Sequence, residues 1–208
     1  MVEDDRYEPD PRMRAPHRLS VWLKSKDLEY TTCEEIKRDV GKRLVHAFED
    51  EDFYGFRLRK DIIGAGDPQN LEYFLQASPA AVGTLAYIAF ETRRLYEETG
   101  AKGPFQPLVV TALVEPEEYA RQKGKPEALA HCSGHVFDID YSARPPAELE
   151  ALRFVLSDLG WEGYLGFVED GMESLHIGCS PGAREFFTKV FQEAAGKAAG
   201  DAVEGEAR

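Results

Sequence analysis

The chain has 208 residues, of which 43% are hydrophobic and 11% aromatic, so it carries enough apolar material to bury the core of a folded domain. With 38 acidic and 25 basic residues its net charge is -13, which would repel a nucleic-acid backbone, and we expect no nucleic-acid partner. No apolar run approaches the roughly 20 residues that span a bilayer, so no transmembrane segment is expected. The charged start MVEDDRYEPDPRMR is unlike a secretory signal. A cytoplasmic location is therefore expected, or a periplasmic or extracellular one if a signal has been removed.

The first part of the chain is expected to be an arm followed by a helical extension. Residues 1–18 are rich in proline and charge and predict an extended arm, and residues 19–78 predict the helical extension. Within that extension, Thr32 and Glu35 have the spacing of a capping box. Apolar residues at helical spacing follow, so a helix is predicted over residues 32–48.

A second long helix is predicted after a loop. The stretch DIIGAGDPQN, residues 61–70, indicates the loop. Ser78 and Pro79 have the chemistry of an N-cap and a first helical position, and Gly100 is placed to end the helix. A helix over residues 79–99 follows from these signals.

After that helix the pattern changes to the alternation of strands. The β-branched run PLVVTALV, residues 107–114, predicts a buried strand, and Pro116 starts a short helix. Residues 136–141, VFDIDY, alternate between apolar and acidic side chains. One face of this strand should therefore meet the core, while the other face carries Asp138 and Asp140.

The last part of the chain predicts a helix, a hairpin and a second helix. Residues 146–160 carry a leucine stripe and end at a glycine, and a hairpin is predicted around the Asp-Gly pair at 170–171. A final helix is predicted over residues 183–195, with a frayed tail over 196–208. The order of elements predicts an α+β domain over residues 79–195, built on a small, mainly antiparallel sheet flanked by helices.

The stretch HCSGHVFDID, residues 131–140, crowds potential metal ligands into a chain that has only 5 histidines. A catalytic zinc site uses three protein ligands from His, Asp, Glu or Cys and leaves one position for water. Gly134 lies between His131 and Asp138, so the chain can turn there and bring both side chains to one point. Zinc is therefore the expected cofactor, provided that a third ligand comes from elsewhere.

His176, in the predicted strand SLHIGCS, is the candidate third ligand because no other histidine follows residue 135. Glu173 precedes it at the spacing Glu-x-x-His. A carboxylate near a metal is the general base that metal-assisted peptide hydrolysis requires. The two residues are an odd number apart and would face opposite sides of a regular strand, so the chain must bend before Glu173.

The two motifs together resemble a known family. His-x-x-Gly-x-x-x-Asp leading into an alternating strand, followed after a helix by a hairpin with Glu-x-x-His, resembles the D-alanyl-D-alanine carboxypeptidase and dipeptidase family of zinc peptidases. This family shares a fold group with lysostaphin-type endopeptidases and the hedgehog signalling domain. The resemblance covers roughly residues 80–190 and identifies the chain as a divergent member.

The resemblance implies an activity and assigns roles to residues. His131, Asp138 and His176 would bind zinc, and Glu173 would take a proton from water as the catalytic base. The protein would then be a hydrolase, a metallopeptidase of carboxypeptidase or dipeptidase type. Its expected partner is a peptide substrate from the bacterial cell wall, such as a peptidoglycan stem peptide.

Some positions depart from the family pattern or stand beside it. Leu129 occupies the place of a serine, and Glu115 occupies the place of an arginine that holds the substrate or stabilises the oxyanion. Arg121 is the candidate substitute for that arginine. His135 and Asp140 are expected beside the ligands or at the rim of the site, where they would contact a ligand or the substrate.

Three other interpretations remain open. The chain can be a catalytically inactive zinc-binding or scaffold protein on the same fold. Cys132 and Cys179 flank His131 and His176, so a structural Cys/His zinc site is a second alternative. In a third, the protein is an acidic cytoplasmic interaction protein without a metal. In the main interpretation the 3 cysteines are free, small buried apolar residues, because they cannot all pair and show no Cys-x-x-Cys spacing.

Overall fold

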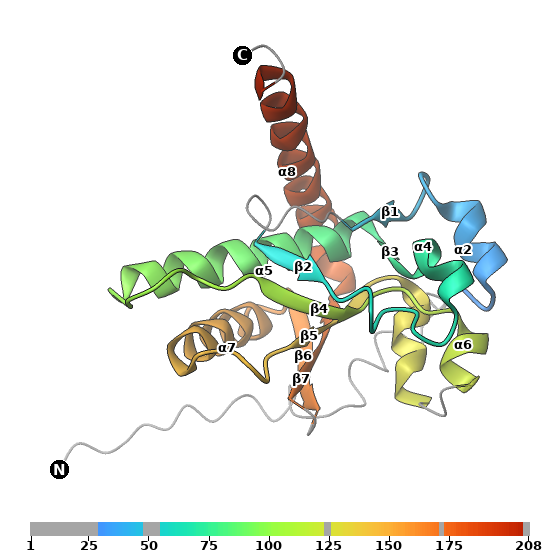
Figure 1. Ribbon diagram of the computed structural model, residues 1–208, viewed down its shortest axis with the longest axis horizontal. Helices are drawn as coiled ribbons and strands as arrows, with labels where there is room; N and C mark the ends of the chain where they lie inside the picture. Colours follow the sequence, from blue (N-terminus) through green and yellow to red (C-terminus); the bar gives the residue numbers. More distant parts are fainter. Residues whose placement is uncertain (1–28, 48–54, 123–125, 171–172, 206–208) are drawn as a thin grey trace.

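A computed structural model describes residues 29–47, 55–122, 126–170 and 173–205 (Figure 1). The expected arm over residues 1–18 lies outside the described residues. The main sheet has the strand order β2-β4-β5-β7-β6. Its strands are β2 (Phe56–Leu58), β4 (Leu108–Ala112), β5 (Val136–Asp140), β6 (Leu165–Asp170) and β7 (Ser174–Cys179). Only the β2–β4 pair in this sheet is parallel, so the mainly antiparallel α+β fold is confirmed.

Helices and short turns surround the sheet. They are α2 (Cys33–Asp39), α4 (Leu71–Phe74), α5 (Pro79–Glu98), α6 (Glu117–Gln122), α7 (Pro146–Trp161) and α8 (Arg184–Gly205), with the 3-10 helices η1 (Pro68–Asn70), η2 (Pro126–Ser133) and η3 (Pro181–Ala183). A second small sheet pairs β1 (Val45–His46) with β3 (Gln76–Ala77). None of the helices in the described part of the chain has the length and apolar character to cross a membrane.

The main core lies between the sheet and two helices, α5 and α7, on one of its faces (Figure 1). Phe137 and Ile139 of β5 belong to this core and are fully buried, as the alternation in VFDIDY predicts. Helix α8 packs against α5, and its far part projects away from the sheet (Figure 1). Gly83 makes that packing possible, because a Cβ there would lie 1.9 Å from the carbonyl oxygen of Phe187.

The described part of the expected helical extension also contributes to the sheets. The capping box of Thr32 and Glu35 is confirmed, but the helix predicted over residues 32–48 ends at Asp39. Val40 adopts an extended backbone, Gly41 has φ 74°, and the chain then enters β1. That prediction was wrong because pairing with β3 outweighs the helical periodicity. The same extension supplies β2, an edge strand of the main sheet.

Most other predicted elements are confirmed, with shifted ends. Ser78 caps α5 through a hydrogen bond that its Oγ accepts from Ala81, and Gly100 follows the helix with φ 71°. Helix α7 passes the predicted glycine stop by one residue and ends at Trp161. The last helix was predicted to stop at residue 195 and instead continues to Gly205, which suits the high helix propensity of its alanines.

Candidate metal centre

The sheet face that points away from α5 and α7 carries the predicted ligands of the last strands. Side chains alternate along a strand, so Asp138 of β5 faces away from the core side on which Phe137 and Ile139 lie. Asp138 pairs with His176 of β7, and His176 pairs with Val168 of β6. Asp138 and His176 are therefore next to each other on this open face.

Helix η2 brings His131 to the same face. Ala130 of η2 packs against Val136 and Val168, which hold the helix on the sheet. After His131 the chain turns at Gly134, which has φ 68° and whose N–H donates to the carbonyl of His131. This is the turn that the glycine between the two ligands predicts.

The three side chains converge closely enough to hold a metal ion. Nε2 of His131 lies 3.3 Å from Oδ1 of Asp138, and Nδ1 of His176 lies 2.7 Å from the same oxygen. One ligand atom from each residue lies within 4.8 Å of the others. Two donors bound to one tetrahedral zinc at about 2.0 to 2.1 Å would lie about 3.3 to 3.4 Å apart. The distance between His131 and Asp138 matches this value and that between Asp138 and His176 is shorter, so this group of donors could hold a metal ion.

The hydrogen bonds select the tautomer of His131 that a metal needs. Its Nδ1 lies 2.7 Å from the carbonyl oxygen of Leu113, which can only accept, so Nδ1 carries the proton. The lone pair of Nε2 is then directed at the position between Asp138 and His176 when the ring is neutral. A backbone carbonyl that fixes the ring in this way is a common support of metal-binding histidines.

Charge is strongly coupled within the group. Burial by itself would lower the pKa of His131, but the charge of Asp138, the hydrogen bond to it and the charge of Glu115 raise this pKa to about 9. Burial would raise the pKa of Asp138, yet the charge of His131 and the hydrogen bonds from both histidines hold it far below its usual range. Without a metal, the carboxylate of Asp138 is therefore anionic at neutral pH, and the ring of His131 carries a positive charge with a proton on each nitrogen.

Glu173 lies outside this cluster of ligand atoms. It stands directly before β7, with an exposed side chain and φ 65°, and its carbonyl accepts a hydrogen bond from the N–H of Tyr141. Three residues along a strand span about 10 Å, which separates the backbones of Glu173 and His176. Glu173 itself adopts a turn conformation, whereas the bend expected before it falls on residues 171–172, outside the described residues. The role of Glu173 as a base stays a prediction.

The other candidate residues lie at the edges of the site or away from it. Asp140 shares the open face, and its Oδ1 accepts from the N–H of Ser142. His135 bonds through Nδ1 to the hydroxyl of Ser78, 2.7 Å away, and lines a separate cavity. Arg121 is an exposed residue of α6 that pairs with Glu117.

The cysteines are placed as buried thiols. Cys132 and Cys179 are both free and buried, and Cys33 is free and half-buried. Burial raises the pKa of Cys132 to about 12 and that of Cys179 to about 11, which disfavours the thiolate that zinc binds. Within the described residues, the metal-binding group contains no cysteine. The geometry therefore favours the His/Asp/His centre over a structural Cys/His site.

Two contributors to the site were not expected from the sequence. One is the carbonyl of Leu113, which no side-chain pattern reveals. The other is the action of Glu115 on His131, because its carboxyl is only 6% exposed and its charge raises the pKa of that histidine. The signal in the sequence was the place of Glu115 directly after the predicted strand, where the family resemblance puts a site residue.

Comparison with models of protein families, with curated proteins and with solved structures gives no match for this chain.

Proposed function

We propose that this protein is a zinc-dependent peptidase of the D-alanyl-D-alanine carboxypeptidase or dipeptidase type, which acts on bacterial cell-wall peptides. The observation that carries the proposal is the meeting of His131, Asp138 and His176 on the open face of the sheet, with the proton of His131 directed away from the other two. The three residues to which the family resemblance gives the role of metal ligands thus lie together.

The chain's own residues provide the remaining functions of such a site. Bound zinc would supply Lewis acidity, which lowers the pKa of water and polarises a peptide carbonyl. His131, Asp138 and His176 would hold the ion with one negative charge, so the site keeps a net positive charge. Glu173 would accept a proton from water and pass it to the leaving amine.

The strained backbone of Glu173 supports a role for its side chain. It is the one non-glycine residue at positive φ among the described residues. The left-handed conformation costs a non-glycine residue roughly 1 to 2 kcal/mol, and such strain gathers at functional sites. Glycine or asparagine would fit this turn better, so the presence of a carboxylate there suggests that it is used.

An arginine on the same face of the sheet supports the binding of a peptide substrate. The family's arginine is replaced by Glu115, but β2 brings the exposed side chain of Arg57 to this face. Arg57 pairs with Val109, and Val109 pairs with Asp140. Arg57 is therefore our candidate for holding the carboxylate of a peptide, which would favour cleavage near a free C-terminus.

A zinc-binding protein without turnover is the second candidate. It is favoured by the position of Glu173, which is exposed and about three residues of strand away from His176. The carboxyl of Glu115, where the family carries an arginine, would also oppose the negative charge of an oxyanion.

Zinc content and peptide hydrolysis, measured on the same samples, test the proposal. Full-length protein purified without an affinity tag is analysed by elemental mass spectrometry and then incubated with peptides that end in D-alanyl-D-alanine. We expect one zinc per chain and release of D-alanine, both lost in His176→Ala and retained in His46→Ala, which alters an exposed histidine of β1. Zinc without hydrolysis would favour the binding protein, and protein that takes up no zinc even when it is added would overturn both.

A further inference from the structure

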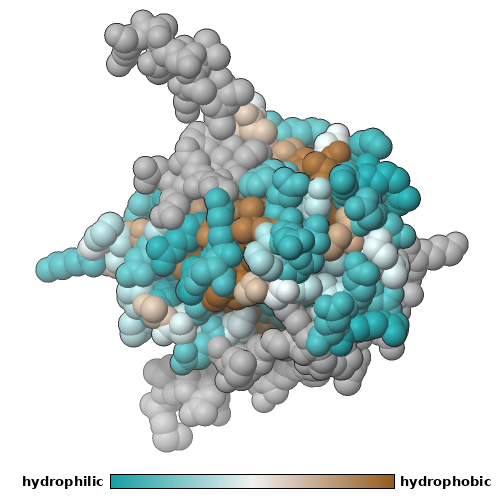
Figure 2. All heavy atoms as spheres, turned by 45° about the vertical axis from the view of Figure 1, so that its right-hand side comes forward, coloured by the Kyte–Doolittle hydropathy of each residue, from teal (hydrophilic) through white to brown (hydrophobic). Residues whose placement is uncertain are grey.

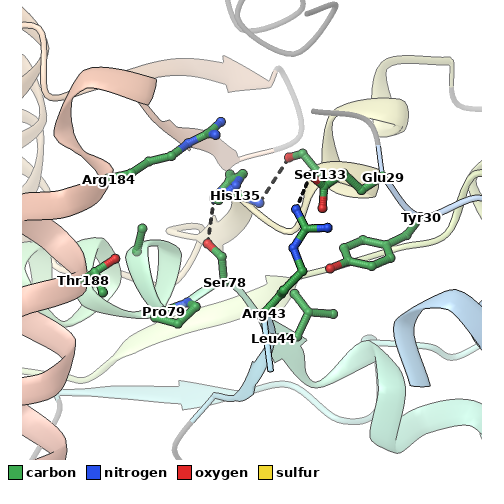
Figure 3. A pocket seen from close by; sticks show the side chains of 11 residues that line it. Glu29, Tyr30, Arg43, Leu44, Ser78, Pro79, Ser133, His135, Arg184 and Thr188 are labelled. Atoms are coloured by element: carbon green, nitrogen blue, oxygen red, sulfur yellow. Dashed lines mark hydrogen bonds and ion pairs between the residues drawn. The ribbon is translucent and has the colours of Figure 1, made fainter. Parts of the chain in front are cut away.

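A cavity of about 140 Å³ lies next to the loop that carries His131, where several parts of the chain meet (Figure 3). It is lined by the start of α5, the start of α8, the segment that carries Ser133 and His135, and residues 29–30 and 43–44. A water needs about 10 to 15 Å³ of such volume, so the cavity can take a ligand of several non-hydrogen atoms. None of its lining residues belongs to the group of His131, Asp138 and His176.

The lining is rich in groups that donate hydrogen bonds. Arg184 approaches from α8 and Arg43 from the opposite side, with Ser78 and His135 between them (Figure 3). The hydroxyl of Thr188 also faces this space. Guanidinium and hydroxyl groups gathered around one small cavity are the chemistry that recognises oxyanions.

The charge of the lining is positive in a protein that is otherwise acidic. Arg43 forms ion pairs with Glu29 and, at 3.7 Å, with Asp39, so its charge is compensated. Arg184 brings a second guanidinium, and among the described residues of the lining Glu29 supplies the one carboxylate. The described lining thus contains two arginines and one glutamate, although the chain as a whole has a net charge of -13.

The start of α5 adds to this field. The helix runs from Pro79 to Glu98, and the N-terminal end of a helix carries partial positive charge. Ser78, its N-cap, holds its hydroxyl between the N–H of Ala81 and the ring of His135, at 3.1 and 2.7 Å. These bonds fix the polar groups of the cavity in place before any ligand arrives.

We propose that this cavity between Ser78, His135 and Arg184 is a binding site for a small oxyanion, either phosphate or the carboxylate of a small metabolite. The guanidinium of Arg184 and the hydroxyl of Thr188 would donate to its oxygens, and the hydroxyl of Ser78 would also donate when Nδ1 of His135 carries the proton of their shared hydrogen bond. Binding needs neither the metal nor peptide hydrolysis, so it stands independently of the proposed function.

The site would be coupled to the loop that carries His131. The N–H of Ser78 donates to the carbonyl of Gly134 at 2.8 Å, and the N–H of Gly134 donates to the carbonyl of His131. The hydroxyl of Ser133 bonds to the carbonyl of Ala130, 2.8 Å away. A bound oxyanion would order this segment, whose far end holds a predicted zinc ligand.

Titration of the full-length, metal-free protein tests the proposal. Inorganic phosphate and acetate are added separately at constant ionic strength, with chloride as the reference, and binding is followed by calorimetry and by amide NMR. We expect one saturable site, with shifts at the amides of Ser78 and Gly134. Arg184→Gln should weaken binding at least tenfold, Arg184→Lys less, and Arg94→Gln, an exposed arginine of α5, not at all.

The outcomes separate the sources of the ligand and the two sites. Tighter binding of phosphate would identify a phosphate site, and tighter binding of acetate a carboxylate site. The proposal is overturned if neither ion saturates, if Arg184→Gln binds as tightly as wild type, or if His176→Ala abolishes binding, which would place the ion at the metal centre. The NMR shifts are measured on wild type, so the test stands even if a variant fails to fold.

Discussion

Asp138 and His176 lie directly opposite each other on β5 and β7, and Nδ1 of His176 is 2.7 Å from Oδ1 of Asp138. The same oxygen is 3.3 Å from Nε2 of His131, so a single carboxylate joins the two imidazoles. This arrangement makes Asp138 the central residue of the candidate metal centre, and several consequences can be measured.

Replacing Asp138 with asparagine should remove zinc without unfolding the protein. The amide keeps an oxygen that can accept a hydrogen bond but loses the negative charge that offsets the charge of the metal. Because changes beside metal ligands already cost about 10 to 100-fold in affinity, loss of a ligand should cost more than about 100-fold. Zinc affinity is measured by competition with a chelator.

Asp140→Asn is the matched control for this change. Asp140 lies on the same strand and the same face, but its oxygen bonds to the N–H of Ser142. We expect zinc affinity close to wild type. Equal loss of zinc in both variants would mean that the general charge of the face, and not ligation by Asp138, holds the metal.

The pH dependence of the metal-free protein should follow His131. Its pKa of about 9 is above the value of about 6.5 that an unfolded histidine has, so folding favours the protonated ring. This stabilisation is fully present below about pH 6.5 and is lost as the pH rises through about 9. The lowered pKa of Asp138 gives stabilisation that is lost only when the pH falls below about 4.

Zinc affinity should change with pH in the opposite direction. Binding must displace the proton of His131, so affinity should rise as the pH approaches 9. Urea unfolding in the presence of a chelator at about pH 6 and about pH 9 measures the first effect, and calorimetry in two buffers of different ionisation enthalpy measures proton release on zinc binding. His131→Gln should remove most of the change in stability, and an unchanged slope in that variant would assign the effect to another group.

The local features of this site can be predicted from the sequence, but the register between β5 and β7 cannot. Alternation in VFDIDY places Asp138 opposite the core side of β5, and Gly134 marks the turn behind His131, and both features are found. That His176 faces Asp138 depends on how β7 pairs with β5, which is a contact between distant parts of the chain. Strand pairing of this kind is set by the packing of the whole sheet, so the motif spacing could only suggest it.

The N-terminal part shows where local patterns mislead. Apolar residues at helical spacing continue past Asp39, yet the chain leaves the helix there and Val45 pairs with Ala77. The strand that carries Arg57 is short and pairs in parallel with β4. Because its partner lies far along the chain, no pattern within the strand predicts it, and the sequence alone points to Arg121 as the cation in place of Arg57.

The face seen in Figure 2 is mainly hydrophilic, with smaller hydrophobic areas between the polar residues, as the high content of charged residues suggests. Composition therefore anticipated the general character of the surface. It could not anticipate the positive lining of the cavity at Arg184, because that depends on which charged residues come together in the fold.

Gly134→Ala should weaken zinc binding by disturbing the turn behind His131. Gly134 has φ 68°, and an added Cβ would lie 3.0 Å from the side chain of Leu44. The left-handed backbone alone should cost roughly 1 to 2 kcal/mol of stability, measured by urea unfolding. Gly182→Ala is the control, because a Cβ at Gly182 meets no atom within 4 Å and should leave both properties unchanged. Full zinc affinity in Gly134→Ala would show that the turn does not position His131.

Glu173 separates an enzyme from a protein that only binds zinc. If its carboxylate takes a proton from water, Glu173→Gln should lower peptide hydrolysis by about 100 to 10,000-fold while zinc stays bound. The control is Glu193→Gln, an exposed glutamate of α8, which should retain activity. Activity is measured as D-alanine released by zinc-loaded protein.

Glu173→Gly adds a measurement that a merely structural residue would not produce. Since Glu173 has φ 65°, glycine should relieve its strain and raise the free energy of unfolding by about 1 kcal/mol. Higher stability together with lost hydrolysis would show that the chain keeps an unfavourable residue at this turn for its chemistry. Hydrolysis that survives both substitutions would remove Glu173 from the mechanism. The candidate base would then be the buried carboxyl of Glu115, whose charge already acts on His131.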